Sequence, residues 1–249
     1  MNTDVLLATQ GPIWTLTLNR PERLNAVCES LYSALEQALL DAEADPACQV
    51  VILAGSGRAF CAGADLKLHQ SGRTEAQRRD YLWQEQRVCR QLLTLNKPVL
   101  CALQGYAIGA GLELALNTDW RIGADTLQVS LPELGIGNYV GGGVTVLLPA
   151  LVGLAQARRL LLQPERRFTA AELLQMGLLD AVVDETELQE ATLLRAEALA
   201  RMPADNLARA RQHLRRGLMN HYDAALVDEW QAMVAATGSD AWHQKVAGA

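Results

Sequence analysis

The fold class is decided by the stretch Val99-Leu-Cys-Ala-Leu-Gln-Gly-Tyr-Ala-Ile-Gly-Ala-Gly-Leu-Glu-Leu-Ala-Leu116. Its apolar run, Val99–Leu103, follows Pro98 and predicts a buried strand. A glycine-rich loop, Gly105–Gly111, comes next and opens a short apolar helix that extends to about Leu116. The same order begins earlier at Val50–Leu53, an apolar run that glycine bounds. Because strand, loop and helix alternate, we predict an α/β architecture in which helices cover a sheet.

Other elements are expected on both sides of these stretches. A hairpin is predicted for residues 5–18, where apolar and polar residues alternate around Gly11-Pro12. Helices are predicted for residues 29–44, 74–95, 186–201, 205–217 and 223–235. A capping box at Thr169–Glu172, with Gly177 as the C-cap, predicts one more helix. We place a soft boundary near residue 190, between a core of residues 1–190 and a helical region of residues 191–249.

Composition excludes several classes of protein. The net charge of -6 argues against a general nucleic-acid binder, which needs a basic surface. The N-terminus lacks the pattern of a signal peptide, and apolar runs such as 144–152 are far short of a membrane span. The five cysteines are odd in number and include no C-x-x-C pair, which indicates reduced thiols in a cytoplasmic protein. The four histidines show no metal-ligand spacing, so we expect no metal site.

Two glycine-rich loops each follow a predicted strand, at Gly55–Lys67 and at Gly105–Glu113. Small residues at such places let a ligand approach the backbone closely. The second loop also opens a helix, whose first N–H groups have no helical partner. One N–H from each loop could hold a carbonyl oxygen, as stabilisation of an enolate or oxyanion requires. The alternatives are that the glycines only form tight turns, or that they begin a dinucleotide fingerprint; leucine at position 114 weakens the latter.

Two glutamates stand in apolar surroundings near these loops. Glu113 lies among leucines and alanine in the short helix, and Glu133 lies within Pro132-Glu-Leu-Gly135. A glutamate in an apolar setting should have a raised pKa, which suits proton transfer near neutral pH. A surface glutamate and a turn glutamate are the alternative for each residue taken alone. Because the pair accompanies two glycine loops, we favour a catalytic site.

With these motifs in view, the chain resembles the enoyl-CoA hydratase/isomerase (crotonase) superfamily from about residue 5 to residue 235. Seven motifs match in order: Asn19–Ala26, Arg58–Lys67, Lys97-Pro98, Gly105–Glu113, Pro132-Glu133, Gly141–Gly143, and Phe168–Leu173 continuing to Gly177. The resemblance implies a spiral of ββα units with a C-terminal helical trimerisation region. It also implies a homotrimer or a homohexamer built as a dimer of trimers.

The resemblance assigns roles to individual residues. Ala64 and Ala110 occupy the two positions whose backbone N–H groups form the family's oxyanion hole, and Ala110 stands where glycine is more common. Glu113 and Glu133 occupy the positions of the family's acid/base pair. Further substrate or coenzyme A contacts are implied for Arg23, Ala26, Ala62, Asp65, Leu66, Lys67 and Gly109.

The presence of both glutamates favours hydration of a 2-enoyl-CoA within the family. The resemblance implies no cofactor beyond the coenzyme A of the substrate, and no nucleic-acid or membrane partner. Two alternatives stay open: isomerisation or dehydration of a specialised acyl-CoA, and a catalytically silent binding or scaffold protein. The chain departs from the family at Val140, where proline is usual, and Asn138 and Tyr139 are polar and bulky beside it. These departures leave the identity of the acyl group open.

Overall fold

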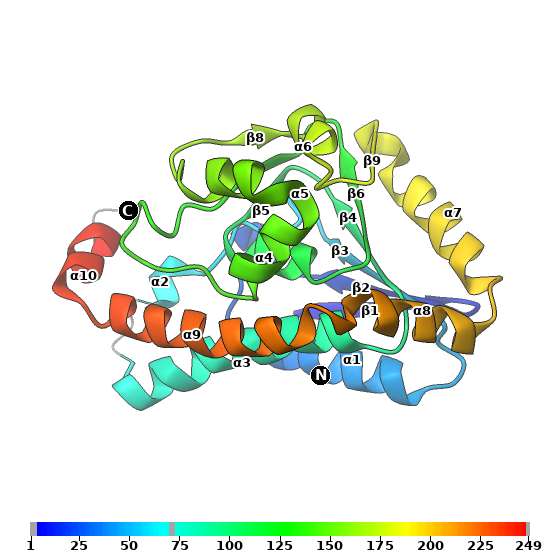
Figure 1. The fold of residues 1–249 in the computed structure, drawn as a ribbon, viewed down its shortest axis with the longest axis horizontal. Helices are drawn as coiled ribbons and strands as arrows, with labels where there is room; N and C mark the ends of the chain where they lie inside the picture. The colour runs from blue at the N-terminus through cyan, green and yellow to red at the C-terminus, as the bar shows by residue number, and fades with distance from the viewer. Residues whose placement is uncertain (1–3, 70–72, 248–249) are drawn as a thin grey trace.

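The computed structural model describes residues 4–69 and 73–247. Its main sheet has six strands in the order β1-β2-β3-β4-β6-β9 (Figure 1). Their bounds are β1 Val5–Gln10, β2 Ile13–Leu18, β3 Val50–Gly55, β4 Val99–Leu103, β6 Trp120–Ala124 and β9 Ala181–Val183. The first two strands form the expected antiparallel hairpin, and all later neighbours are parallel. A small second sheet joins β5 Tyr106–Ile108, β7 Gln128–Ser130 and β8 Phe168–Thr169.

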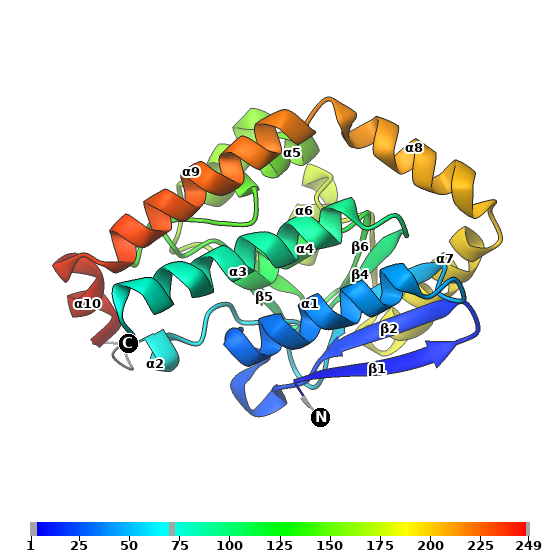
Figure 2. The same cartoon turned by 90° about the horizontal axis from the view of Figure 1, so that it is seen from below.

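The sequence predicted that helices cover a sheet, and in the structure they cover both faces of the main sheet. They are α1 Glu29–Ala44, α2 Leu66–His69, α3 Glu75–Thr94, α4 Ala110–Leu116, α5 Val144–Leu161, α6 Ala170–Met176, α7 Leu188–Ala200, α8 Ala204–Arg216, α9 Met219–Thr237 and α10 Asp240–Ala247, with short 3₁₀ turns at Pro21–Arg23 and Glu185–Glu187. Alternate strand residues point to opposite faces. Val51 and Leu53 therefore join the large core under α1 and α3, whereas Val50 and Ile52 pack against α7. Figure 2 shows α1 and α3 side by side, with α9 running along α3.

The α/β fold and the C-terminal helices are thus confirmed. The proposed boundary at residue 190 falls inside α7, which packs on β2, β3, β4 and β6. The role of the C-terminal helices in trimer assembly stays a prediction.

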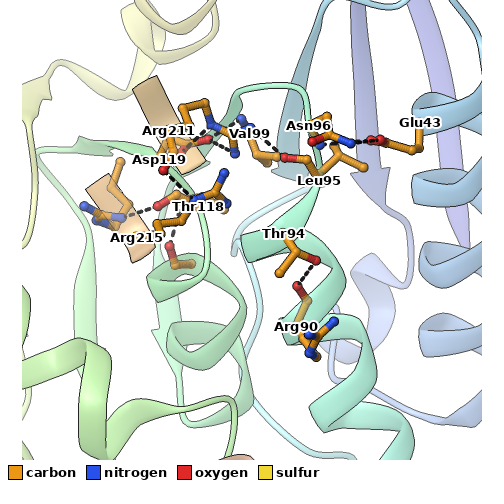
Figure 3. Close-up of polar contacts among 12 residues, drawn as sticks. Glu43, Arg90, Thr94, Leu95, Asn96, Val99, Thr118, Asp119, Arg211 and Arg215 are labelled. Atoms are coloured by element: carbon orange, nitrogen blue, oxygen red, sulfur yellow. Dashed lines mark hydrogen bonds and ion pairs between the residues drawn. The ribbon is translucent and has the colours of Figure 1, made fainter. Parts of the chain in front are cut away.

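Helix α8 is held to the sheet by a buried charged side chain. Arg211 is the buried residue of α8, and its Nε donates to Asp119 Oδ1 at 2.8 Å (Figure 3). Its Nη1 donates to the Leu95 carbonyl at 2.6 Å. The other Asp119 oxygen accepts from the N–H of Val99 at 2.8 Å, where β4 begins. A buried arginine of this kind must be paired, so these contacts fix α8 against the start of β4.

Helix α5 is long and apolar enough to cross a membrane by length and composition, with a mean hydropathy of 1.4 over 18 residues, 33% of them buried. In the sequence, the apolar run of residues 144–152 is far short of a membrane span. The helix continues to Leu161 because Gly153, with φ 74° and ψ 156°, joins two helical pieces across a kink. Core helices also pass this test of length and apolarity, and α5 contacts α4 and α9. It is therefore weak evidence for a membrane span.

Candidate active site

The first glycine loop presents the N–H of Ala64 toward the second loop. Val27 donates its N–H to the Gly63 carbonyl at 2.8 Å, and Asp65 donates to the Val27 carbonyl at 3.0 Å. In such a parallel bridge the residue between the two bonds, here Ala64, points its own N–H away from Val27. That is the side on which Cys61 pairs with β5. The Ala64 N–H is therefore available on the side of β5 and α4.

The second loop places the N-terminus of α4 against the first. Ala110 is the first residue of α4, so its N–H has no partner within the helix. A Cβ built on Gly63 would lie 3.0 Å from the Ile108 carbonyl oxygen and 4.0 Å from the Ala110 nitrogen. A Cβ on Gly111 would overlap the backbone of Cys61. Small residues are thus needed for the two loops to touch, and their contact brings the predicted oxyanion positions, Ala64 and Ala110, to one place.

Both predicted glutamates lie beside this helix N-terminus. Glu113, in the first turn of α4, is 2% exposed, and its Oε1 accepts from the N–H of Gly141 at 2.8 Å. Glu133 is 9% exposed, and its carboxylate lies so close to Gly109 that a Cβ there would overlap its Oε1. The second oxygen, Oε2, is buried without a hydrogen-bond partner among the residues that the structure describes. A buried acceptor without a partner is uncommon in a folded protein and marks a candidate for a functional role.

The pKa values of these carboxyl groups are shifted as the sequence predicted. Burial raises the pKa of Glu113 well above its ordinary value, and a third buried glutamate, Glu85, raises it further. Burial also raises the pKa of Glu133 well above its ordinary value, with a smaller contribution from the charge of Glu113. Groups of this kind can hold or release a proton near neutral pH.

A run of three glycines, Gly141–Gly143, is held by side chains from three helices. The N–H of Gly141 donates to Glu113 of α4, that of Gly142 to Gln86 of α3, and that of Gly143 to Glu229 of α9, at 2.8, 2.8 and 2.7 Å. The Asn117 side chain donates to the carbonyls of Glu113 and Gly142. This network fixes Glu113 relative to the loop that follows Glu133.

Glu85, Gln86 and Glu229 were not among the residues predicted from the sequence. A usable signal was present, because these polar residues lie on apolar helix faces. Glu85 and Gln86 lie among the buried residues Tyr81, Leu82, Val88 and Cys89 of α3, and Glu229 lies between Leu226 and Met233 of α9. A carboxyl at helical spacing within an apolar stripe indicates a buried polar contact in the same way that Glu113 did.

The remaining predicted positions fall into two groups. Ala26, Ala62 and Asp65 lie side by side, because Ala62 donates to the Leu24 carbonyl and Arg20 joins the Ala26 carbonyl to the Asp65 carboxylate. Leu66 is half-buried next to them and Gly109 lies under Glu133, whereas Arg23 and Lys67 are exposed on the outside. The Asn19–Ala26 motif is largely structural: Asn25 donates to the carbonyls of Ser56 and Ala59 and so ties the motif to the end of β3.

Comparison with known proteins agrees with this geometry. The sequence profile of the family described as Enoyl-CoA hydratase/isomerase matches residues 8–246. A short-chain-enoyl-CoA hydratase of Clostridium acetobutylicum is 31% identical over 231 residues, which are 92% of this chain and 87% of that protein. A carnitinyl-CoA dehydratase of Salmonella typhi is 31% identical over 245 residues, covering 92% of both chains. The crystal structure of an enoyl-CoA hydratase from Mycobacterium avium subsp. paratuberculosis K-10 superposes with a TM-score of 0.90 at 25% identity, covering 99% of this chain and 95% of that one.

Proposed function

Because the chain belongs to the enoyl-CoA hydratase/isomerase family, we propose that it is an enoyl-CoA hydratase, which adds water across the double bond of a 2-enoyl-CoA. The family assignment makes the chain an enzyme rather than a silent scaffold. The observation that carries the proposal is the pair of buried glutamates at the N-terminus of α4, where Glu133 keeps one carboxylate oxygen free.

In the proposed reaction, the thioester oxygen lies between the N–H groups of Ala64 and Ala110. The Glu113 carboxylate takes a proton from water, and the water oxygen bonds to the β-carbon. The electron pair of the double bond moves to the thioester oxygen, where the two N–H groups stabilise the enolate. Glu133 then gives its proton to the α-carbon, and the carbonyl forms again. The raised pKa of Glu133 supports this role, because a buried carboxyl keeps its proton until the enolate appears.

The other predicted positions complete the proposed substrate site. We place Ala26, Ala62, Asp65, Leu66 and Gly109 along the acyl-CoA, and the exposed cations Arg23 and Lys67 suit its phosphates. We expect no cofactor beyond the coenzyme A of the substrate. We also expect a homotrimer or homohexamer that works in the cytoplasm.

Dehydration is the second candidate, because the same two carboxyl groups would catalyse the reverse step. The similarity to a carnitinyl-CoA dehydratase over nearly the full chain favours this candidate for an acyl group that carries a leaving hydroxyl. Isomerisation would move the double bond without adding water. Product analysis with a 3-enoyl-CoA, a 2-enoyl-CoA and a 3-hydroxyacyl-CoA separates the three reactions.

The test is the variant Glu133→Gln, assayed with crotonyl-CoA by the absorbance of the conjugated thioester. A positioned acid or base contributes ~10²–10⁴-fold, so hydration should fall by that factor while binding of coenzyme A persists. The matched control is Glu165→Gln, which makes the same chemical change at an exposed position. Hydration by Glu133→Gln within a factor of two of the wild type would refute the assignment.

A further inference from the structure

A buried asparagine at the end of α4 joins the proposed catalytic helix to the glycine run. Asn117 is the C-cap of α4 and is 1% exposed. Its Nδ2 donates to the Glu113 carbonyl at 2.8 Å and to the Gly142 carbonyl at 2.7 Å. Its Oδ1 accepts from the hydroxyl of Tyr222, a residue of α9, at 2.6 Å. One amide therefore connects α4, the glycine run and a helix that lies 105 residues further along the chain.

The hydroxyl of Tyr222 fixes the direction in which the Asn117 amide points. Two carbonyl oxygens can accept only from the NH₂ end of that amide, so the amide oxygen must face the tyrosine. The hydroxyl then donates to this oxygen, as the short contact between them indicates. An amide turned the other way would leave both carbonyls without a donor, which is costly at a buried position.

Close packing leaves this arrangement little freedom. A Cβ built on Gly142 would lie 3.0 Å from the Glu113 Cβ and 3.4 Å from the Asn117 Nδ2. A Cβ built on Gly143 would overlap the ring of Tyr222, which is fully buried. The glycine run therefore lies directly against the side chains of Glu113, Asn117 and Tyr222.

The position of the glycine run bears on where the Glu113 carboxyl lies. Gly141 donates its N–H to Glu113 Oε1 at 2.8 Å, and Gly142 is the next residue of the loop. A shift of the Gly142 carbonyl would therefore move the Gly141 N–H as well. Asn117 thus acts on Glu113 at two points, through the carbonyl of Glu113 itself and through the loop that binds its carboxyl.

We propose that Asn117 and Tyr222 are positioning residues for the proposed hydration: Asn117 keeps the Glu113 carboxyl against Gly141, and Tyr222 keeps the Asn117 amide in the direction that this requires. The inference rests on the proposed function, in which Glu113 takes the proton of water. No bond is made or broken at either positioning residue. The pair makes the catalytic group of α4 dependent on α9, which belongs to the helical region after residue 190.

The test compares kcat and KM of single variants with crotonyl-CoA. Tyr222→Phe removes the hydroxyl alone and keeps the ring against Gly143. It should lower kcat by ~2–12-fold, the equivalent of one neutral hydrogen bond. Asn117→Leu keeps the size of the side chain but removes both donors, and a misplaced catalytic group can lower kcat ~10²-fold. KM should change little in both variants, because neither side chain binds the substrate.

The double variant tests whether Tyr222 acts through Asn117. In Asn117→Leu the hydroxyl has already lost its acceptor, so the addition of Tyr222→Phe should lower kcat no further. Independent roles would instead multiply the two losses. Thr237→Val is the matched control, because it also removes a buried hydroxyl from α9, one that donates to the Met233 carbonyl of the same helix at 2.7 Å. This control should keep the wild-type kcat.

Denaturant unfolding of the same preparations shows that each variant is folded. The inference is overturned if folded Asn117→Leu and Tyr222→Phe keep the wild-type kcat, or if the double variant shows the product of the two single losses. Where Asn117→Leu does not fold, equal kcat values for Tyr222→Phe and Thr237→Val overturn it. Failure of the proposed function has a separate sign, because Glu133→Gln would then hydrate crotonyl-CoA at the full rate.

Discussion

Replacement of Gly109 by alanine should disable the site through a single added methyl group. Gly109 is the N-cap of α4, with φ 51° and ψ -120°, a conformation that residues with a Cβ avoid. The new Cβ would lie 3.3 Å from the carboxyl carbon of Glu133 and overlap its Oε1. Backbone strain of this kind costs about 1–3 kcal/mol of stability. Displacement of Glu133 should lower hydration by ~10²–10⁴-fold, as loss of a positioned acid does.

Gly153→Ala separates the two effects. Gly153 also has a positive φ, 74°, at the kink of α5, but no atom lies within 4 Å of a Cβ built there. The free energy of unfolding of this variant should fall by a similar ~1–3 kcal/mol, and its hydration activity should be retained. Denaturant unfolding and the crotonyl-CoA assay measure the two quantities on the same preparations. If folded Gly109→Ala hydrates crotonyl-CoA as fast as Gly153→Ala does, the position of the Glu133 carboxyl against Gly109 is not needed for catalysis. The proposed site geometry would then be wrong.

Further predictions concern the oxyanion hole, the anchor of α8 and assembly. Ala110→Pro deletes a backbone N–H at the first residue of α4, where proline is tolerated, so a folded variant should lose ~10²–10³-fold in turnover, whereas Ala110→Gly should not. Arg211→Ala should lower the free energy of unfolding by about 1.5–3 kcal/mol for each charged hydrogen bond that it removes. Arg209 is exposed on the same helix, so Arg209→Ala should change that free energy little. Thermal unfolding measures both variants. Light scattering at micromolar concentration should give a trimer or hexamer mass, and a clean monomer would contradict that prediction.

The long elements could be predicted because each has a strong local signal. Helix α1 ends before Asp45-Pro46, and strand β4 begins after Pro98, both at the residues expected. The capping box at Thr169 begins α6. The second sheet could not be predicted, because β5, β7 and β8 have only two or three residues and no usable periodicity. Strand β6 was missed for another reason. Its Arg121 is a charged residue in a buried strand, and its guanidinium donates to the carbonyls of Thr118, just before the strand, and of Leu178, which is distant in sequence.

The residues of the candidate site also differ in how far the sequence predicts them. Glu113 and Glu133 stood out because an apolar neighbourhood is visible in a few consecutive residues. The apolar stripes around Gln86 and Glu229 indicate burial, but their partners could not be foreseen, because these contacts join segments that are distant in sequence. No local sequence pattern indicates that side chains of both α3 and α9 contact Gly141–Gly143. Only the packed fold brings these side chains to one loop.

The buried side chains around the glycine run also explain why it has no side chains of its own, because its backbone N–H groups must be reached closely. Each of its three N–H groups meets a different side chain, and a carboxylate without such a donor would be costly to bury. Glu229 uses both oxygens in this way, on the N–H groups of Gly143 and Thr145, and so also binds the N-terminus of α5. Because Glu229 belongs to α9, the candidate site depends on residues from both sides of position 190. A chain that ended there would lose the acceptor of Gly143, and with it one of the three contacts that hold Gly141 against Glu113.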